Sequence, residues 1–168
     1  MKTVLDATCG SRMIWFNPNN PIALFVDKRQ IEHEEIWHSK NGKNRRYLTV
    51  KPDVIADYKE LPFDDEIFYL VVFDPPHLLR GGDTGWQVKK YGRLPVNWEE
   101  ELRQGFNECM RVLKQHGTLI FKWCEVQIPV SRVIKALGDR YYPLFGNRCG
   151  KQGKTHWMCF IKEEICSG

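Results

Sequence analysis

The sequence predicts an α/β domain of three layers, built on a mostly parallel sheet with an antiparallel C-terminal edge. Two observations predict it: apolar runs of strand length recur along the whole chain, and segments of helical periodicity accompany the later ones. With 168 residues, of which 42% are hydrophobic, the chain suffices for one domain over residues 1–168 whose core needs no disulfides. No repeat, linker or low-complexity segment divides it.

Five short apolar runs predict strands that are buried on both faces, as in a parallel sheet. The predicted strands are Thr3–Ala7, Ile22–Val26, Asp53–Ala56, Tyr69–Phe73 and Thr118–Trp123. The first four end at or beside an aspartate, and the fifth ends near Glu125.

Helical periodicity is clearest in Trp98–Gln115, and His116-Gly117 predicts the end of that helix. Its apolar face consists of Leu102, Phe106, Met110 and Leu113. A second helix is predicted over Val130–Leu137, where Gly138 ends it. Few residues separate Gly10 from the second strand, so the helix expected between them is little more than two turns long.

Two pairs of strand-like segments interrupt this order. Ile31–Trp37 and Arg45–Lys51 flank Asn41-Gly42, a dipeptide that favours a tight hairpin turn. Tyr141–Phe145 and Thr155–Lys162 flank a loop near the C-terminus. The second pair predicts the antiparallel edge of the sheet.

Four aspartates stand at or next to the carboxyl ends of predicted strands: Asp6, Asp27, Asp57 and Asp74. In an open parallel sheet, ligands bind in the crevice outside those ends. An acidic edge suits hydroxyls, amines or a cation as ligands, whereas the alternative is that each aspartate only forms a turn. Asp6 is followed by the single Gly10 and not by G-x-G-x-x-G, so the dinucleotide fingerprint is absent. Gly10 still permits a ligand to approach the backbone closely.

The order of these motifs resembles that of class I S-adenosylmethionine-dependent methyltransferases. The residues that carry the resemblance are Asp6 to Gly10, Asp27, Asp57-Tyr-Lys-Glu-Leu-Pro-Phe63, Asp74-Pro75-Pro76-His77 and the helix-to-strand segment Arg111–Ile120. The resemblance covers nearly the whole chain, and more narrowly the chain is similar to small methyltransferase-like proteins of bacteriophages and prophages. It implies a Rossmann-like methyltransferase fold and S-adenosylmethionine as cofactor. The chain departs at His116-Gly117, where the family more often has Pro-Gly-Gly.

The resemblance implies a role for each cofactor-binding position. Asp27 would accept hydrogen bonds from the ribose hydroxyls, and Asp57 from the adenine amino group. Asp6 and the backbone of Cys9-Gly10 would face the methionine portion, whose ammonium favours a nearby acid. Phe63 would flank the adenine, and its alternative is a place in the core.

Asp74-Pro75-Pro76-His77 occupies the position of the Asp-Pro-Pro-aromatic motif of amino-group methyltransferases. The resemblance implies that Asp74, which also borders the cofactor, and the Pro75 carbonyl accept the two N–H bonds of an amino group and aim its lone pair at the methyl. Proline has no N–H, so Pro75-Pro76 stiffens the loop and offers only acceptors. His77 stands where the family has a stacking ring, and we expect it to stack as a neutral imidazole that loses function as pH falls through the usual histidine range. The alternative is a turn-capping aspartate beside a loop histidine.

The segment Leu78–Asn97 is rich in glycine and lacks periodicity, which predicts a functional loop. Its candidate substrate-binding residues are Trp86, Lys89, Lys90 and Tyr91, and Trp123 at the end of the fifth strand is a further candidate. Basic and aromatic residues together suit phosphate contacts and base stacking. Other basic residues are Lys40, Lys43, Arg45 and Arg46 on the first hairpin and Arg148, Lys151 and Lys154 near the C-terminus. The alternative for each group is solvated surface charge.

These features predict a methyltransferase that acts on an exocyclic amino group of a nucleobase, with DNA or RNA as its partner. The alternatives are methylation of a small molecule or a protein amide, and a binding module that holds the cofactor without turnover. The net charge of +4 neither requires nor excludes nucleic acid.

No apolar run is long enough to span a membrane, and a strand-like run directly after Met1 leaves no room for a signal peptide. We therefore expect a cytoplasmic protein with reduced cysteines and no membrane partner. No metal site is expected, because the loose group Cys149, His156 and Cys159 has the wrong spacing for zinc.

Overall fold

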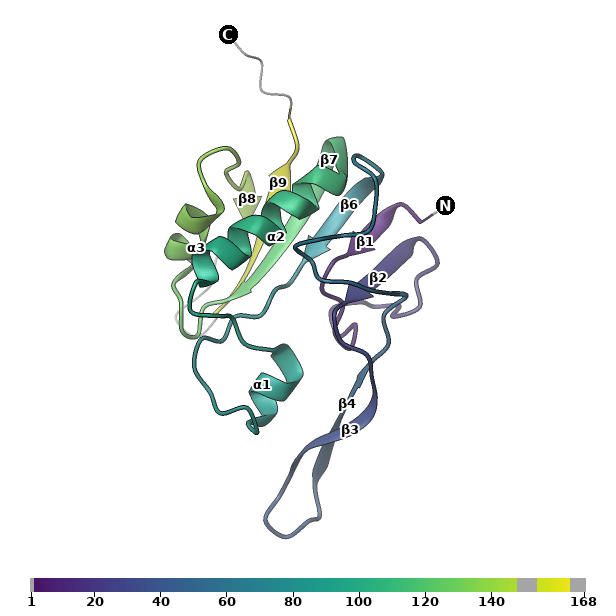
Figure 1. Cartoon of the computed structure of the whole chain (residues 1–168), viewed down its shortest axis with the longest axis vertical. Coiled ribbons are helices and arrows are strands. Elements are labelled where there is room, and N and C mark those ends of the chain that lie inside the picture. The colour runs from purple at the N-terminus through teal and green to yellow at the C-terminus, as the bar shows by residue number, and fades with distance from the viewer. Residues whose placement is uncertain (1, 148–153, 164–168) are drawn as a thin grey trace.

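A seven-stranded sheet runs through the protein in the computed structural model, which describes residues 2–147 and 154–163 (Figure 1). The strand order is β5 (Val54–Ile55), β2 (Ala23–Asp27), β1 (Val4–Asp6), β6 (Phe68–Phe73), β7 (Leu113–Cys124), β9 (Thr155–Ile161) and β8 (Phe145–Gly146). The strands from β5 to β7 are parallel, and β9 and β8 are antiparallel. The mostly parallel sheet and its antiparallel C-terminal edge are thus confirmed. Cys149, Arg148 and Lys151 lie outside the described residues.

The register of the central strands brings their carboxyl ends to one edge of the sheet. Asp6 of β1 is opposite Phe25 of β2 and Val72 of β6. Because all three strands run in the same direction, the residues that follow each of them leave the sheet at the same edge.

Two helices cover one face of the sheet. α2 (Trp98–Val112) and α3 (Val130–Leu137) contact each other and contribute to the same apolar core as the sheet. Phe106 of α2 packs against Phe160 of β9 at a ring-centroid distance of 5.0 Å. The predicted α3 is confirmed with its bounds.

The C-terminus of α2 differs from the prediction of a helix to Gln115. The helix ends at Val112, and β7 begins directly at the fully buried Leu113. His116, at a φ of 62°, bends the strand instead of ending a helix. Its N–H donates to the carbonyl of Lys162, and Lys162 N–H donates to the carbonyl of Gly117, so the end of β9 satisfies the backbone at the bend.

Coil, and not the expected short helix, connects β1 and β2 and covers the other face of the sheet there. Residues 7–22 form turns and bends, in which Pro18 and Pro21 each lack the N–H that a helix would use. Trp15 packs edge-on against Phe25 at 5.1 Å, and the guanidinium of Arg12 lies 3.8 Å from the centre of the same ring. The third layer over β1 and β2 is therefore built without helical hydrogen bonds.

The predicted hairpin forms a separate antiparallel sheet of β3 (Ile31–His38) and β4 (Arg45–Val50), which extends away from the main sheet (Figure 1). A short helix, α1 (Trp86–Tyr91), lies beside its base within the segment predicted as loop. Trp86 packs against the apolar cluster of Ile36, Leu48 and Val50 on the hairpin. This contact explains why a sequence without helical periodicity is ordered there.

Gly105 in α2 provides a test of how closely that helix packs. A Cβ at this position would lie 2.5 Å from Cδ2 of Tyr58 and 2.9 Å from Cζ of Phe73. Alanine favours a helix by about 1 kcal/mol over glycine, but overpacking costs about 1–3 kcal/mol. We expect Gly105→Ala to lower the free energy of unfolding by about 1 kcal/mol, and the Tm by roughly 2–4 °C, in thermal denaturation followed by circular dichroism.

The neighbouring Gln104→Ala is the control, because Gln104 is exposed on the same helix. A Gly105→Ala protein as stable as Gln104→Ala would show that α2 shifts away from Tyr58 without cost.

Candidate active site

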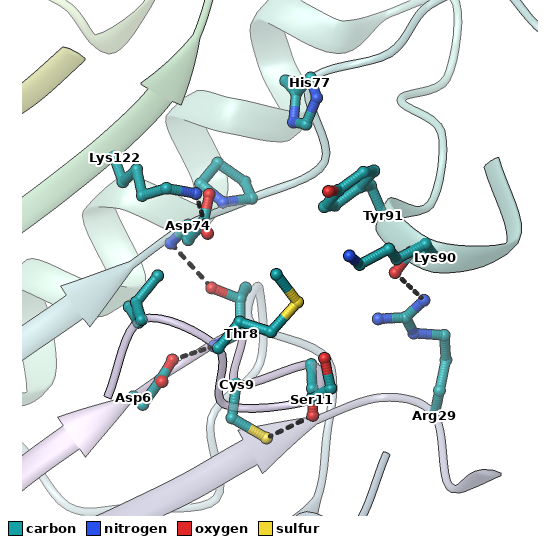
Figure 2. A pocket seen from close by; sticks show the side chains of 14 residues that line it. Asp6, Thr8, Cys9, Ser11, Arg29, Asp74, His77, Lys90, Tyr91 and Lys122 are labelled. Carbon is teal, nitrogen blue, oxygen red and sulfur yellow. Dashed lines mark hydrogen bonds and ion pairs between the residues drawn. The ribbon is translucent and has the colours of Figure 1, made fainter. Parts of the chain in front are cut away.

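Two adjoining cavities lie at the carboxyl ends of the central strands. The larger, of about 200 Å³, is bounded by the segments that follow β1 and β6, by Lys122 of β7 and by α1 (Figure 2). The smaller, of about 70 Å³, reaches toward the end of β2. Thr8, Arg29, Asp74 and Tyr91 line both cavities and therefore stand at their boundary.

Most of the predicted site residues meet at these cavities. Those that line the larger cavity are Asp6, Cys9, Gly10, Asp74, Pro75, His77, Lys90 and Tyr91. Asp27 and Pro76 line the smaller one. Predicted cofactor-binding and acceptor-binding positions thus share one continuous region.

Two predicted cofactor-binding residues lie elsewhere. Phe63 is partly buried, packs edge-on against Phe68 at 5.3 Å and borders the apolar core, as its alternative describes. Asp57 caps a turn by accepting a hydrogen bond from the backbone N–H of Lys59 at 3.0 Å. Neither side chain lines the two cavities.

Three predicted substrate-binding residues also face away from the cavities. Trp123 is fully buried, because alternation along β7 turns its side chain toward α2. Its indole N–H donates to the carbonyl of Ile128. Trp86 faces the hairpin, and Lys89 forms an ion pair with Glu34 there at 2.8 Å. Only the last turn of α1, with Lys90 and Tyr91, reaches the larger cavity.

Asp6 is a buried carboxyl at the floor of the larger cavity, with only 1% of its surface exposed. Trp15 Nε1 donates to Oδ2 at 2.7 Å, and the Thr8 N–H donates to Oδ1 at 3.2 Å. Desolvation by burial raises its pKa to about 7 against the opposing effect of these hydrogen bonds. An arriving cation would therefore find a group that is readily ionised in its presence.

Thr8, which sequence reasoning missed, joins the β1 loop to the β6 loop. Its Oγ1 accepts a hydrogen bond from the backbone N–H of Asp74 at 2.8 Å (Figure 2). The sequence feature that could have identified Thr8 is its position two residues after Asp6 at the strand end. A hydroxyl there can accept a hydrogen bond from the backbone of a neighbouring loop.

Asp27 is saturated with hydrogen bonds. Its Oδ2 accepts from the Gly10 N–H at 3.0 Å and from Arg29 Nη2 at 3.2 Å. Its Oδ1 accepts from the backbone N–H of Arg29 at 2.9 Å and from Arg29 Nε at 3.0 Å. A carboxylate offers about four lone-pair sites, so a further donor can bind only if one of these four leaves.

Arg29 also ties the end of β2 to α1. Its Nη1 donates to the carbonyl oxygens of Lys89 and Lys90 in the last turn of that helix, both at 3.3 Å. The Arg29 guanidinium thus bridges Asp27 and α1, the helix that includes Tyr91.

Asp74 follows β6 and is paired with Lys122 of β7. Lys122 Nζ donates to Asp74 Oδ2 at 2.5 Å (Figure 2). Burial raises the pKa of Asp74, while the adjacent ammonium opposes that effect. Lys122 precedes the predicted Trp123 on β7, and it is Lys122 that lines the cavity.

His77 lies 9% exposed on the wall of the cavity opposite the β1 loop, with its ring 5.2 Å from that of Tyr91. Desolvation, with a smaller effect of Lys122, lowers its pKa to about 4. The ring is therefore neutral at physiological pH, and in the folded protein we expect the neutral form to be lost near pH 4 instead of in the usual histidine range.

The set of groups can bind a ligand that carries both hydroxyls and a cation, and can orient an amino group beside it. Asp6 and Asp27 supply carboxylates at two places, and Asp74 supplies a third between them and His77. The Cys9 thiol is not a nucleophile here, because burial and the nearby Asp6 raise its pKa to about 12. Among the described residues, no group of three His, Cys, Asp or Glu side chains could hold a metal ion, and no helix could cross a membrane.

The protonation of His77 should make stability depend on pH. The unfolded side chain takes up a proton near pH 6.5, whereas the folded one stays neutral to about pH 4. Protons therefore favour the unfolded chain below pH 6.5, and stability is lost as pH falls. Between pH 7 and pH 5 we expect the wild type to lose about 2 kcal/mol relative to His77→Phe, at about 1.36 kcal/mol for each of the roughly 1.5 units below 6.5.

Urea denaturation of both proteins at the two pH values measures this difference. Asp6 contributes with the opposite sign in the same range, because its folded pKa is raised, but it is common to both proteins and cancels. Equal pH dependence of the two proteins would show that His77 titrates normally in the folded state.

Comparison with known proteins places the fold. No protein-family model and no curated protein matches the sequence. Among solved structures, the PH0226 protein from Pyrococcus horikoshii OT3 is 15% identical with a TM-score of 0.57, over 95% of this chain and 81% of that chain. The N-methyltransferase NodS from Bradyrhizobium japonicum WM9 is 10% identical with a TM-score of 0.54, over 96% of this chain and 85% of that chain.

A third match is the 1,6-didemethyltoxoflavin-N1-methyltransferase from Burkholderia thailandensis, solved with 1,6-didemethyltoxoflavin and S-adenosylhomocysteine. It is 12% identical with a TM-score of 0.52, over 96% of this chain and 71% of that chain. Identities this low show the fold alone. The protein has the Rossmann-like fold of S-adenosylmethionine-dependent methyltransferases, as the resemblance of its motifs implies.

Proposed function

We propose that this protein transfers the methyl group of S-adenosylmethionine to an uncharged amino group, and that the acceptor is a nucleobase in DNA or RNA. The observation that carries the proposal is the convergence of Asp6, Asp27 and the Asp74-Pro75-Pro76-His77 motif on two adjoining cavities at the carboxyl edge of a methyltransferase-like sheet. Asp6 and Asp27 would accept hydrogen bonds from the cofactor, Asp74 would accept them from the amino group, and His77 would stack on the acceptor.

The two cavities suit the two ends of the cofactor. The ribose hydroxyls would bind Asp27 in the smaller cavity. The adenine would then lie beside Lys28 and Tyr58, which line the same cavity. The methionine ammonium would bind near Asp6 and the Gly10 turn, where a cation lowers the raised pKa of Asp6. Gly10, at a φ of 49°, permits this close turn of the backbone.

Cofactor binding at Asp27 would require Arg29 to move. The Gly10 N–H and the Arg29 N–H belong to the backbone and remain, whereas the guanidinium can rotate away and free one lone pair on each oxygen. Two ribose hydroxyls would replace two guanidinium donors. Because Arg29 also donates to the Lys89 and Lys90 carbonyls, its departure would release α1 from the end of β2.

The transfer step would join the amino nitrogen to the methyl carbon. The nitrogen lone pair forms the N–C bond while the C–S bond breaks, and its electrons remain on sulfur as a neutral thioether. The nitrogen then carries the positive charge and loses one proton, which the Asp74 carboxylate can accept and pass to solvent. The neutral ring of His77 would stack on the acceptor without adding a charge near the sulfonium.

Nucleic acid is supported as the partner by the basic residues around the site. Lys90 lines the larger cavity, and the tip of the β3–β4 hairpin, which extends beyond α1, carries exposed Lys40 and Lys43 (Figure 1). Lysines at these positions could contact phosphates while a base enters the cavity. Methylation of a small molecule or a protein amide would need no such extension.

The first test is binding of the cofactor and of S-adenosylhomocysteine by calorimetry. We expect Asp27→Ala to weaken binding at least tenfold, because a charged acceptor of two hydroxyls contributes about 1.5–3 kcal/mol. Arg29→Met should tighten binding by roughly two- to tenfold, because the partly exposed ion pair, which stabilises the free protein by no more than about 1 kcal/mol, no longer has to break.

Arg45→Met serves as the matched control, since Arg45 pairs with Glu35 on the hairpin, away from both cavities. Weaker binding by Arg29→Met would mean that the guanidinium contacts the cofactor directly. Unchanged binding by Asp27→Ala would remove Asp27 from the ribose site.

The second test is transfer of tritiated methyl from labelled S-adenosylmethionine to DNA, total RNA and protein. We expect label in nucleic acid, and we expect Asp74→Ala to reduce transfer by about 10²–10³ while it leaves cofactor affinity nearly intact. Lys40→Ala combined with Lys43→Ala should raise the KM for nucleic acid without changing kcat, and should flatten the salt dependence of binding by about one to two units of slope.

Label only in protein or in small-molecule extracts would exclude the nucleobase and favour the corresponding alternative. Cofactor binding without transfer to any of these acceptors would favour a binding module without turnover.

A further inference from the structure

Lys122 reaches the candidate active site because of the register between two parallel strands. Val72 of β6 is opposite Ile120 of β7, and Phe73 is opposite Phe121. Continuing that register places position 122 beside Asp74, with both side chains on the face that α2 does not cover. The core residues Phe121 and Trp123 alternate with Lys122 toward α2.

Contacts on both sides fix the Lys122 ammonium. It donates to Asp74 Oδ2 at 2.5 Å, and it lies 5.8 Å from the ring centre of Trp157 on the neighbouring strand β9. Its side chain is only 19% exposed. A lysine held in this way differs from a solvated surface lysine, whose ammonium exchanges among many positions.

Lys122 leaves one oxygen of Asp74 available to a ligand. Within residues 2–147 and 154–163, no other side chain forms a hydrogen bond with the Asp74 carboxylate, while its backbone N–H is held by Thr8 Oγ1 at 2.8 Å. Oδ1 therefore lies at a cavity wall with its lone pairs unused.

The surroundings of Asp74 otherwise disfavour its charge. Asp74 lines both cavities. The titratable groups of the larger one are Asp6 of β1, Cys9 after β1, Arg29 after β2, His77 after β6, Lys90 and Tyr91 of α1, and Lys122 of β7. The smaller one adds Asp27 of β2, Lys28 after β2, Tyr58 after β5 and Arg93 after α1. Of these, Lys122 alone contacts the carboxylate. Burial raises the pKa of Asp74, and the Lys122 ammonium is the group that lowers it.

We infer that Lys122 is a positioning residue for methyl transfer: it keeps the Asp74 carboxylate charged and oriented, with Oδ1 toward the acceptor, and it restricts the acceptor to an uncharged amino group. The restriction follows because an alkylammonium would meet two cations, Lys122 and the sulfonium, and has no lone pair to donate. Amino groups conjugated to a ring or a carbonyl are uncharged at neutral pH and satisfy it. The role in transfer rests on the proposed function, whereas the coupling between Lys122 and Asp74 does not.

The coupling can be measured on the protein alone by NMR titration of the ¹³C-labelled carboxyl group of Asp74, without cofactor or acceptor. Lys122→Met should raise the midpoint by about 1–3 pH units, the range by which an opposite charge at this distance shifts a carboxyl group. Lys122→Arg should keep the midpoint near that of the wild type. Lys114→Met is the matched control, because Lys114 lies at the other end of β7 over the ring of Tyr69.

A midpoint in Lys122→Met that stays within about half a unit of the wild type would overturn the inference, since a partner charge is expected to move it by at least about one unit. A shift of the same size in Lys114→Met would also overturn it, because the effect would then come from β7 as a whole.

The role in transfer is tested by the pH dependence of methylation with the labelled cofactor. Below the midpoint that NMR measures for the variant, Lys122→Met should lose about tenfold in kcat for each pH unit, because one pH unit changes the ionised fraction of Asp74 about tenfold. Above that midpoint kcat should recover, with cofactor affinity unchanged. A loss that does not recover with pH would overturn the positioning role.

Wild-type methylation of polylysine in preference to DNA or RNA would overturn the restriction to uncharged amino groups. No transfer by any variant, wild type included, would overturn the proposed function and with it the role in transfer, while the NMR midpoints would still decide the coupling of Lys122 to Asp74.

Discussion

Carboxylates gathered at one edge of a parallel sheet are the constraint on which the rest of this structure depends. The register of β1, β2 and β6 brings Asp6, Asp27 and Asp74 to the same edge. Burial there disfavours the charged form of Asp6 and Asp74. Each carboxyl group is accommodated differently. Asp6 accepts a hydrogen bond from the Trp15 indole, and its raised pKa favours the protonated form. Asp27 accepts from four donors, and Asp74 pairs with the Lys122 ammonium. The loops around the edge are ordered largely by these interactions.

The strand-end positions could be predicted from the sequence because apolar runs and the aspartates that end them are local signals. Asp6, Asp27 and Asp74 are all at the cavities for this reason. The partners of those aspartates could not be predicted, because Trp15 and Lys122 reach them across the fold. Strand alternation decides between Lys122 and Trp123, and one residue of uncertainty in a strand reverses which of them faces the site. The predicted end of α2 was wrong for a similar reason: Leu113 continues the helical pattern but pairs with Phe68 of β6, and Lys114 and Gln115 belong to β7.

The layer over β1 and β2 shows how a chain of this length completes a site with few helices. Residues 7–22 contain no helix, yet their Trp15 both fills the apolar space against Phe25 and donates to Asp6. Arg12 secures the same coil by donating to the carbonyl oxygens of Pro18 and Lys51. Trp15 and Arg12 thus order this coil without a helix, and Trp15 connects the ring of Phe25 directly to Asp6 at the floor of the cavity.

The six residues of α1 connect the hairpin to the cavity. Trp86 at one end packs on the hairpin, and Tyr91 at the other end lines both cavities. The six residues of α1 rise about 9 Å, which is less than two helical turns. The hairpin, which forms its own sheet outside the main one, is therefore joined to the cavity wall by this short helix.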